Sequence, residues 1–165
     1  MIVVKPVGGL ANQIVIYAAA KTLALHDNKK IYLDLSHYDI NGKRKFRFDE
    51  LNIYYNVIEA SDILKKFGLF TFSGNRFFRK LSNILNKIPF LSRNCLYEES
   101  LVYDSNLVNN VNYSSDVYVQ GNFISYKYYN KILDELKAEC KPKYLSDDFK
   151  SALKSIDTFK SASIH

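Results

Sequence analysis

The N-terminal stretch Ile2-Val3-Val4-Lys5-Pro6-Val7-Gly8-Gly9 decides the fold. Its first three residues are β-branched and apolar, which is typical of a buried strand, and Pro6 and the glycines then permit a tight turn. Residues 11–26 are rich in Ala and Leu and predict a buried helix, with Asn12 near its N-cap position. Residues 30–35 predict a second strand. Strand, glycine turn, helix and strand form one βαβ unit, so we expect an α/β fold with a Rossmann-like parallel sheet flanked by helices.

The rest of the chain predicts further helices and strands in alternation. The helix expected over 126–140 places apolar side chains on one face, namely Tyr129, Ile132, Leu133, Leu136 and Cys140. Asp147 or Asp148 is expected to cap a last helix that ends near residue 156. The other expected elements are a polar loop over 39–47, helices over 61–67 and 75–88, strands over 96–103 and 117–120, and the start of a strand over 162–165.

Composition excludes several classes of protein. With 165 residues, 47% of them hydrophobic, the chain can bury a core of its own. Its two cysteines are too few for a disulfide framework, and no Cys or His cluster has metal-ligand spacing, so no metal is expected. The sequence shows no signal peptide and no apolar run of the roughly 20 residues that a membrane span requires. A secreted miniprotein and an integral membrane protein are therefore excluded, and a cytoplasmic location is expected.

The excess of positive over negative charge lies in one segment. Residues 63–97 contain seven Lys and Arg and no Asp or Glu, which is more than the whole net charge of +6. A near-neutral chain with one basic segment is not typical of a nucleic-acid-binding domain, so no nucleic-acid partner is expected. An RNA-binding module stays open as a weaker alternative, and it would require surface aromatics on a basic strand face.

The glycine turn is the first candidate for a binding site. Gly8 and Gly9 let the backbone approach a ligand closely, and the following helix offers free N–H groups and the positive end of its dipole. Asn12 and Gln13 add neutral side chains that suit sugar hydroxyls or phosphate oxygens. The spacing is neither that of GxGxxG nor that of a P-loop. Taken from the residues alone, a substrate site and a plain turn with a capping Asn are equally good interpretations.

A family resemblance sharpens this choice. Residues 8–14, followed by Tyr17-Ala18-Ala19, resemble the GGLGNQMFQYA opening of the α-1,2-fucosyltransferases of glycosyltransferase family 11. Three later segments resemble others of that family in the same order: 33–38 (LDxSWY), 44–52 (R.FELDKFN) and 117–128 (VYLxGYFQSxKYF). Ala11 replaces a usual Gly, and Ile124 replaces a Gln that would be expected to contact the acceptor.

The resemblance implies the N-terminal part of a GT-B-type enzyme that transfers fucose from GDP-fucose to a galactoside hydroxyl in α-1,2 linkage. Family members are nearly twice as long and carry an H-x-R-R-G-D motif. Residues 163–165 of this chain resemble the start of that motif. The resemblance therefore implies an acceptor-side domain over 1–161 and the start of a truncated donor-binding domain over 162–165. Substrate binding is expected from Gly8, Gly9, Asn12, Gln13 and His165, without a cofactor. The alternative is a non-catalytic glycan-binding remnant of such an enzyme.

Other polar residues are weaker candidates. Asp34 ends a strand, where α/β sites gather, but a turn-forming Asp is the more economical interpretation. His26 fits a helix C-cap or the surface, and His37 is expected in a loop. A basic cluster that is either a phosphate contact or a solvated loop is made of Lys43, Arg44, Lys45 and Arg47. No catalytic residue is assigned.

Residues 75–88 have a further possible use. Their apolar side chains recur at helical spacing, and their polar face is basic without one acidic residue. This pattern is typical of a helix that lies in a membrane interface, here the inner face of the cell membrane. The alternative is that the same apolar stripe packs on the domain's own sheet.

Overall fold

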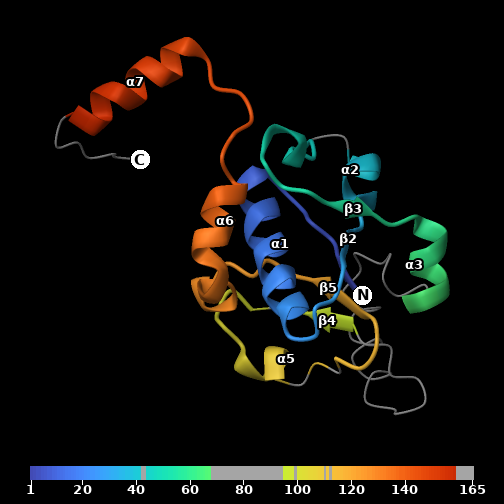
Figure 1. The fold of residues 1–165 in the computed structure, drawn as a ribbon. Coiled ribbons are helices and arrows are strands. Elements are labelled where there is room, and N and C mark those ends of the chain that lie inside the picture. The colour runs from blue at the N-terminus through green and yellow to red at the C-terminus, as the bar shows by residue number, and fades with distance from the viewer. Residues whose placement is uncertain (42–43, 68–94, 99, 110, 112, 159–165) are drawn as a thin grey trace.

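The sheet is the centre of the molecule (Figure 1). The computed structural model describes residues 1–41, 44–67, 95–98, 100–109, 111 and 113–158. Five parallel strands form one sheet in the order β3-β2-β1-β5-β4. They are β1 (Ile2–Val4), β2 (Ile31–Leu33), β3 (Asn56–Val57), β4 (Cys95–Tyr97) and β5 (Val117–Gln120).

Helices cover both faces of this sheet, which confirms the predicted Rossmann-like α/β fold. The α-helices are α1 (Leu10–Leu25), α2 (Ser36–Asn41), α3 (Ala60–Phe67), α5 (Ser105–Asn109), α6 (Leu133–Glu139) and α7 (Asp147–Thr158). Three 3₁₀ turns accompany them: η1 (Phe48–Glu50), η3 (Tyr126–Tyr128) and η4 (Asn130–Ile132). In Figure 1, α1 and α6 lie side by side in front of the sheet.

The two faces of the sheet have separate apolar contacts because side chains alternate along a strand. Ile2 and Val4 of β1 belong to the larger cluster, to which α1 contributes Ile16 and Leu23. Val3, between them, points to the opposite face. There it joins Tyr118 of β5 and two buried side chains of α3, Ile63 and Phe67. All three residues of β1 are fully buried, as expected of the central strand of a parallel sheet.

The first helix begins two residues before its predicted N-cap. Gly9 is the N-cap residue of α1, with φ −81° and ψ 177°, so the prediction that Asn12 caps the helix is wrong. Asn12 lies in the first turn instead, because Gly9 already supplies the extended backbone that an N-cap needs. At the other end His26 is the C-cap, as expected, and its ring stacks on that of Tyr113 at 4.0 Å between centroids.

The helix predicted over 126–140 is broken into η3, η4 and α6. The backbone at Tyr129 has φ −138° and ψ 13°, outside the α-helical range, so the two 3₁₀ turns do not join. Ile132 and Leu136 are buried as the pattern predicted, whereas Leu133 is exposed. One buried cation holds α6 to α1: Lys21 Nζ lies 2.8 Å from Glu135 Oε1 and 2.6 Å from Glu139 Oε1.

Other boundaries differ from the sequence-based expectation. The predicted loop over 39–47 overlaps α2, which also contains His37, expected in a loop. The strand expected over 30–35 is limited to the three residues of β2, and the one expected over 96–103 shares only residues 96 and 97 with β4. Helix α3 and strand β5 are confirmed. The helix predicted over 75–88 and the strand start over 162–165 lie outside the described residues, and so does His165.

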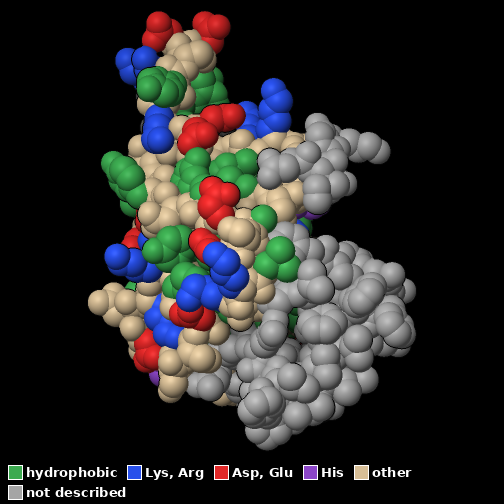
Figure 2. Space-filling view, turned by 90° about the vertical axis from the view of Figure 1, so that its right-hand side faces the viewer, with side chains coloured by type: hydrophobic (Ala, Val, Ile, Leu, Met, Phe, Trp, Pro, Cys, Tyr) green, Lys and Arg blue, Asp and Glu red, His purple; other side chains and the backbone are tan. Residues whose placement is uncertain are grey.

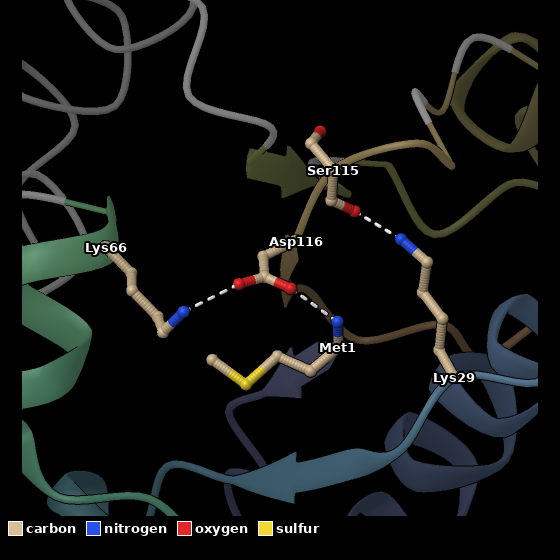
Figure 3. Close-up of polar contacts among 5 residues, drawn as sticks. All are labelled: Met1, Lys29, Lys66, Ser115 and Asp116. Carbon is tan, nitrogen blue, oxygen red and sulfur yellow. Dashed lines mark hydrogen bonds and ion pairs between the residues drawn. The ribbon is translucent and has the colours of Figure 1, made fainter.

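Asp116 joins three elements at the amino ends of the strands (Figure 3). It precedes β5, and its carboxylate pairs with the N-terminal ammonium of Met1 and, at 2.8 Å, with Lys66 Nζ of α3. Lys29 donates to the neighbouring carbonyl of Ser115. Burial opposes ionisation of Asp116, but the hydrogen bonds from Lys66 and the N-terminus outweigh it and lower the pKa of Asp116 below its ordinary value. This contact fixes α3 against the start of β5.

The last helix extends away from the sheet (Figure 1). The hydroxyl of Ser146 accepts the backbone N–H of Phe149 at 3.2 Å, so Ser146 caps α7 where Asp147 or Asp148 was expected. Phe149, Leu153 and Ile156 follow one side of α7 and are all exposed. Among the helices of the described residues, none combines the length and apolar character needed to cross a bilayer.

Candidate functional site

The carboxyl ends of β1 and β5 meet where the strand order of the sheet reverses. From β1 the chain builds outward to β2 and β3, then crosses to the opposite edge and returns through β4 to β5. In open α/β sheets, ligands bind outside the carboxyl ends of the strands at such a point. The glycine turn leaves β1 there, and residues 121–125 leave β5 beside it.

The glycine turn has a defined geometry. Gly8 has φ +75°, in the left-handed region that favours glycine, and its carbonyl accepts hydrogen bonds from Gln13 Nε2 at 3.2 Å and Tyr38 Oη at 3.4 Å. Burial raises the pKa of Tyr38 to about 12, so its hydroxyl stays a donor at neutral pH. The turn therefore approaches the N-terminus of α1 in one fixed conformation.

Gln13 holds this turn to a segment more than thirty residues away. Its side-chain nitrogen donates to the carbonyl of Lys45 at 2.8 Å, and its oxygen accepts the N–H of Arg47 at 3.1 Å. The side chain is fully buried. Gln13 was expected to contact substrate, but it has no exposed surface with which to do so in this structure. It acts on the turn by positioning its neighbours.

A cluster of aromatic rings also holds the segment around Lys45 and Arg47 in place. Phe46 lies between the rings of Tyr38, Phe48 and Tyr55, with centroid distances of 5.8, 4.8 and 5.1 Å, and Phe48 continues to Tyr17 at 5.4 Å. Such tilted and edge-to-face pairs add to the burial of the rings. Lys45 and Arg47, the basic residues on either side of Phe46, are both exposed.

Arg44, the first described residue of the same basic stretch, reaches the glycine turn. A Cβ atom placed on Gly9 would lie 3.8 Å from Nη1 of Arg44, so the guanidinium covers the N-cap of α1. Arg47 is instead paired with Glu50 through two hydrogen bonds of 2.7 and 2.6 Å. The basic residues predicted as a phosphate contact therefore differ in their surroundings. Arg44 lies beside Gly9 and the first N–H groups of α1, and this arrangement suits an anion.

Asn12 shares this surface with Arg44. Its side chain is exposed, and a Cβ atom on Gly8 would lie 2.8 Å from its Nδ2. Ala11, which departs from the family pattern, lies in the first turn of α1 with no positive φ, so a Gly is not needed there. The structure thus brings together Gly8, Gly9, Asn12 and, in a supporting position, Gln13.

The loop after β5 is also held rigidly. Glu98 Oε2 accepts the N–H groups of Asn122 and Phe123 at 2.8 and 3.0 Å. Phe123 has φ +48°, which is strained for a bulky residue, while its ring is buried. Asn122 and Ile124 on either side are exposed, so a side chain at position 124 does face outward.

Sequence reasoning considered Asp34 alone and missed two polar residues that accompany it at the same edge, Lys5 and Gln120. Lys5 follows β1, Asp34 follows β2 and Gln120 ends β5, and Lys5 Nζ lies 3.7 Å from Asp34 Oδ2. The signal was present, because each of these three apolar strands ends in a polar residue. Asp34 also forms the expected turn, since its Oδ1 accepts the N–H of Ser36 at 3.0 Å.

Other features of the described residues are weaker candidates. A pocket of about 80 Å³ between α1 and α5 includes Leu23, Val108 and Lys127, and it is far below the roughly 300–1,000 Å³ of small-molecule sites. No three His, Cys, Asp or Glu side chains within the described ranges are grouped to hold a metal. Figure 2 shows Lys, Arg, Asp and Glu interspersed over the described part of one face.

Comparisons of the chain with protein-family models, with curated proteins and with solved structures found no match. A hypothesis about function therefore depends on the geometry at the carboxyl edge of the sheet and on the resemblance of the sequence motifs. Chemically, that edge offers a rigid backbone turn, a helix N-terminus, the guanidinium of Arg44 and the exposed amide side chain of Asn12. These groups donate to anions and hydroxyls, and they fit the binding and orientation of a polar substrate.

Proposed function

We propose that this chain is the N-terminal, acceptor-side part of a glycosyltransferase that moves fucose from GDP-fucose to a galactoside hydroxyl in α-1,2 linkage. The observation that carries the proposal is the glycine turn, Gly8-Gly9, fixed at the point of strand-order reversal with Asn12 and Arg44 beside it. The four ordered motifs that resemble α-1,2-fucosyltransferases add to it. The proposed setting is the cytoplasm, with residues 75–88 as a candidate contact with the inner face of the membrane.

The reaction asks little of this part beyond orientation. The acceptor oxygen forms a bond to the anomeric carbon of fucose on the face opposite GDP, the bond from that carbon to the diphosphate breaks, and the acceptor hydroxyl loses its proton. Charge accumulates on the leaving diphosphate, so fixed donors near it lower the barrier. In this proposal Asn12 orients the acceptor hydroxyl, and Arg44 and the N-terminus of α1 supply positive potential.

The first test is transfer of labelled fucose from GDP-fucose to lactose. In this proposal the arginines of the H-x-R-R-G-D motif bind GDP, and residues 1–165 include only the first His of that motif, so these residues alone should give no transfer above a blank. If the reading frame continues with Arg-Arg-Gly-Asp, its longer product should be active. Turnover by the 165-residue chain would contradict this division of roles.

The second test separates the enzyme from its alternative, a glycan-binding remnant. Lactose should shift the amide resonances of Gly8, Gly9 and Asn12 in the ¹⁵N-labelled chain, and maltose should not. Lactose binding without transfer by any product of the reading frame would favour the remnant. Equal shifts with lactose and maltose, or none with either, would remove the galactoside from the proposal.

A further inference from the structure

The polar residues that end the central strands lie side by side in one row. The backbone hydrogen bonds between neighbouring strands continue beyond the ends of β1 and β2. The N–H of Asp34 donates to Val4 O at 2.9 Å, and the N–H of Lys5 donates to Val119 O at 3.0 Å. Asp34, Lys5 and Gln120 therefore occupy neighbouring positions across β2, β1 and β5. Side chains in one row of a parallel sheet point to the same face. We call these three residues the polar row.

Contacts place the polar row on the face opposite α1. Tyr118 lies two residues before Gln120 on β5, and its hydroxyl donates to Asp34 Oδ2 at 2.6 Å. Its ring packs with Phe67 of α3, at 5.5 Å between centroids. Burial and then the nearby Asp34 carboxylate raise the pKa of Tyr118 far above its ordinary value, so the hydroxyl remains a donor.

A row of this kind is costly in the middle of a parallel sheet. Such strands are normally apolar throughout, and burying charge is unfavourable even when the charges pair. Asp34 is 1% exposed and Lys5 is 9% exposed. A purely structural contact between β1 and β2 does not need this pair, since two apolar side chains would serve. Its position at the carboxyl edge, where the strand order reverses, points to a ligand.

The chemistry of the polar row selects the class of ligand. Lys5 and Asp34 neutralise one another, so the row carries no net charge to attract an anion. Within the described part of the chain, two buried oxygens next to this pair have no hydrogen-bond partner, Oε1 of Gln120 and Oγ of Ser36. A buried amide oxygen needs a donor, which an ionised phosphate oxygen does not provide and a sugar hydroxyl does.

We propose that the polar row is a subsite for the hydroxyl groups of a saccharide, with Gln120 Oε1 accepting from one of them. Gln120 is half-buried, so part of its side chain is accessible, and the paired Lys5 and Asp34 lie beside it in the row. This inference rests on the proposed function, because that function supplies the sugar. It adds an acceptor-binding residue that the glycine turn does not contain.

The experiment follows the side-chain amide resonance of Gln120 in the ¹⁵N-labelled chain during titration with lactose, myo-inositol and inorganic phosphate. Lactose should shift this resonance, and Gln120→Met should weaken lactose binding about fivefold or more. Asn52→Met, the same kind of exchange at an exposed position, should bind as the wild type does. Ser36→Ala is a second variant that tests the row should Gln120→Met fail to fold.

The outcomes separate this inference from the proposed function. In one outcome, lactose shifts the resonances of the glycine turn but not that of Gln120, and Gln120→Met binds lactose with unchanged affinity. This result would overturn the subsite and would leave the transferase proposal unaffected. Equal responses of Gln120 to lactose and inositol support a hydroxyl subsite and contradict selection of a galactoside. A response to phosphate alone overturns the subsite, and so does no response to any of the three probes.

Discussion

The side-chain nitrogen of Gln13 donates to the backbone carbonyl of Lys45 across thirty-two residues of sequence, at 2.8 Å. The oxygen of the same side chain accepts the N–H of Arg47. These two bonds fix residues 44–47 to α1 and so place Arg44 next to Gly9. The glycine turn and residues 44–47 therefore form one rigid unit.

This arrangement predicts a large stability loss in Gln13→Met. The substitution keeps the volume of a fully buried side chain but leaves the Lys45 carbonyl and the Arg47 N–H without partners. The two bonds are partly buried and an unsatisfied buried group costs about 1–3 kcal/mol, so urea denaturation should show a loss of about 1–3 kcal/mol. Asn52→Met, at an exposed position, is the control and should change stability by less than about 0.5 kcal/mol. A Gln13→Met protein as stable as the wild type would mean that these bonds contribute nothing.

The two glycines should respond oppositely to the same substitution. Gly8→Ser places a side chain at φ +75°, with its Cβ atom 2.8 Å from Asn12 Nδ2, and should cost about 1–2 kcal/mol. Gly9→Ser puts a favoured N-cap residue at an extended backbone position, where Arg44 at 3.8 Å is the one neighbour within contact distance among the described residues. It should be neutral or slightly stabilising in thermal unfolding. Equal losses in both variants would show that the turn is not held in this conformation.

Asn12→Ala should separate function from stability. The side chain is exposed, so the free energy of unfolding should change by less than about 0.5 kcal/mol. If Asn12 orients the acceptor, fucose transfer by a longer, active product should fall at least tenfold, a change of about 1.4 kcal/mol in the barrier. Ala11→Ser, at the adjacent exposed position of α1, is the matched control. An unchanged transfer rate in Asn12→Ala would show that the glycine motif serves only as a structural turn.

The sequence was informative where the signal is local. The apolar run of β5 and the Ala-rich α1 are visible as patterns, because burial on all sides leaves few polar residues in them. β3 was missed because Asn56 and Val57 are both exposed at the sheet edge, and nothing in two such residues indicates a strand. The break at Tyr129 is a matter of backbone conformation that apolar spacing does not report.

The site was predictable to a similar extent. The glycines identified the turn, but Gln13 reaches Lys45, and Arg44 reaches Gly9, through tertiary contacts that no local pattern contains. The polar row needed the strand register, which places Lys5 between Asp34 and Gln120. Once the strands are known to be parallel and adjacent, their terminal polar residues follow directly.

The pairing of Asp116 with Lys66 and the N-terminal ammonium predicts a stability that depends on pH (Figure 3). The pKa of Asp116 is lower in the folded protein than in the unfolded chain, so its contribution is present above the ordinary Asp value and is lost as pH falls through the folded value. Urea midpoints of the wild type and Asp116→Asn should therefore differ by a constant amount between about pH 5 and pH 7, and the difference should shrink progressively as the pH falls below about 4. Asp134→Asn is the control, because Asp134 is 99% exposed beside Lys137 and such pairs contribute little. A difference between wild type and Asp116→Asn that persists unchanged to pH 2 would show that the carboxylate charge does not stabilise this junction.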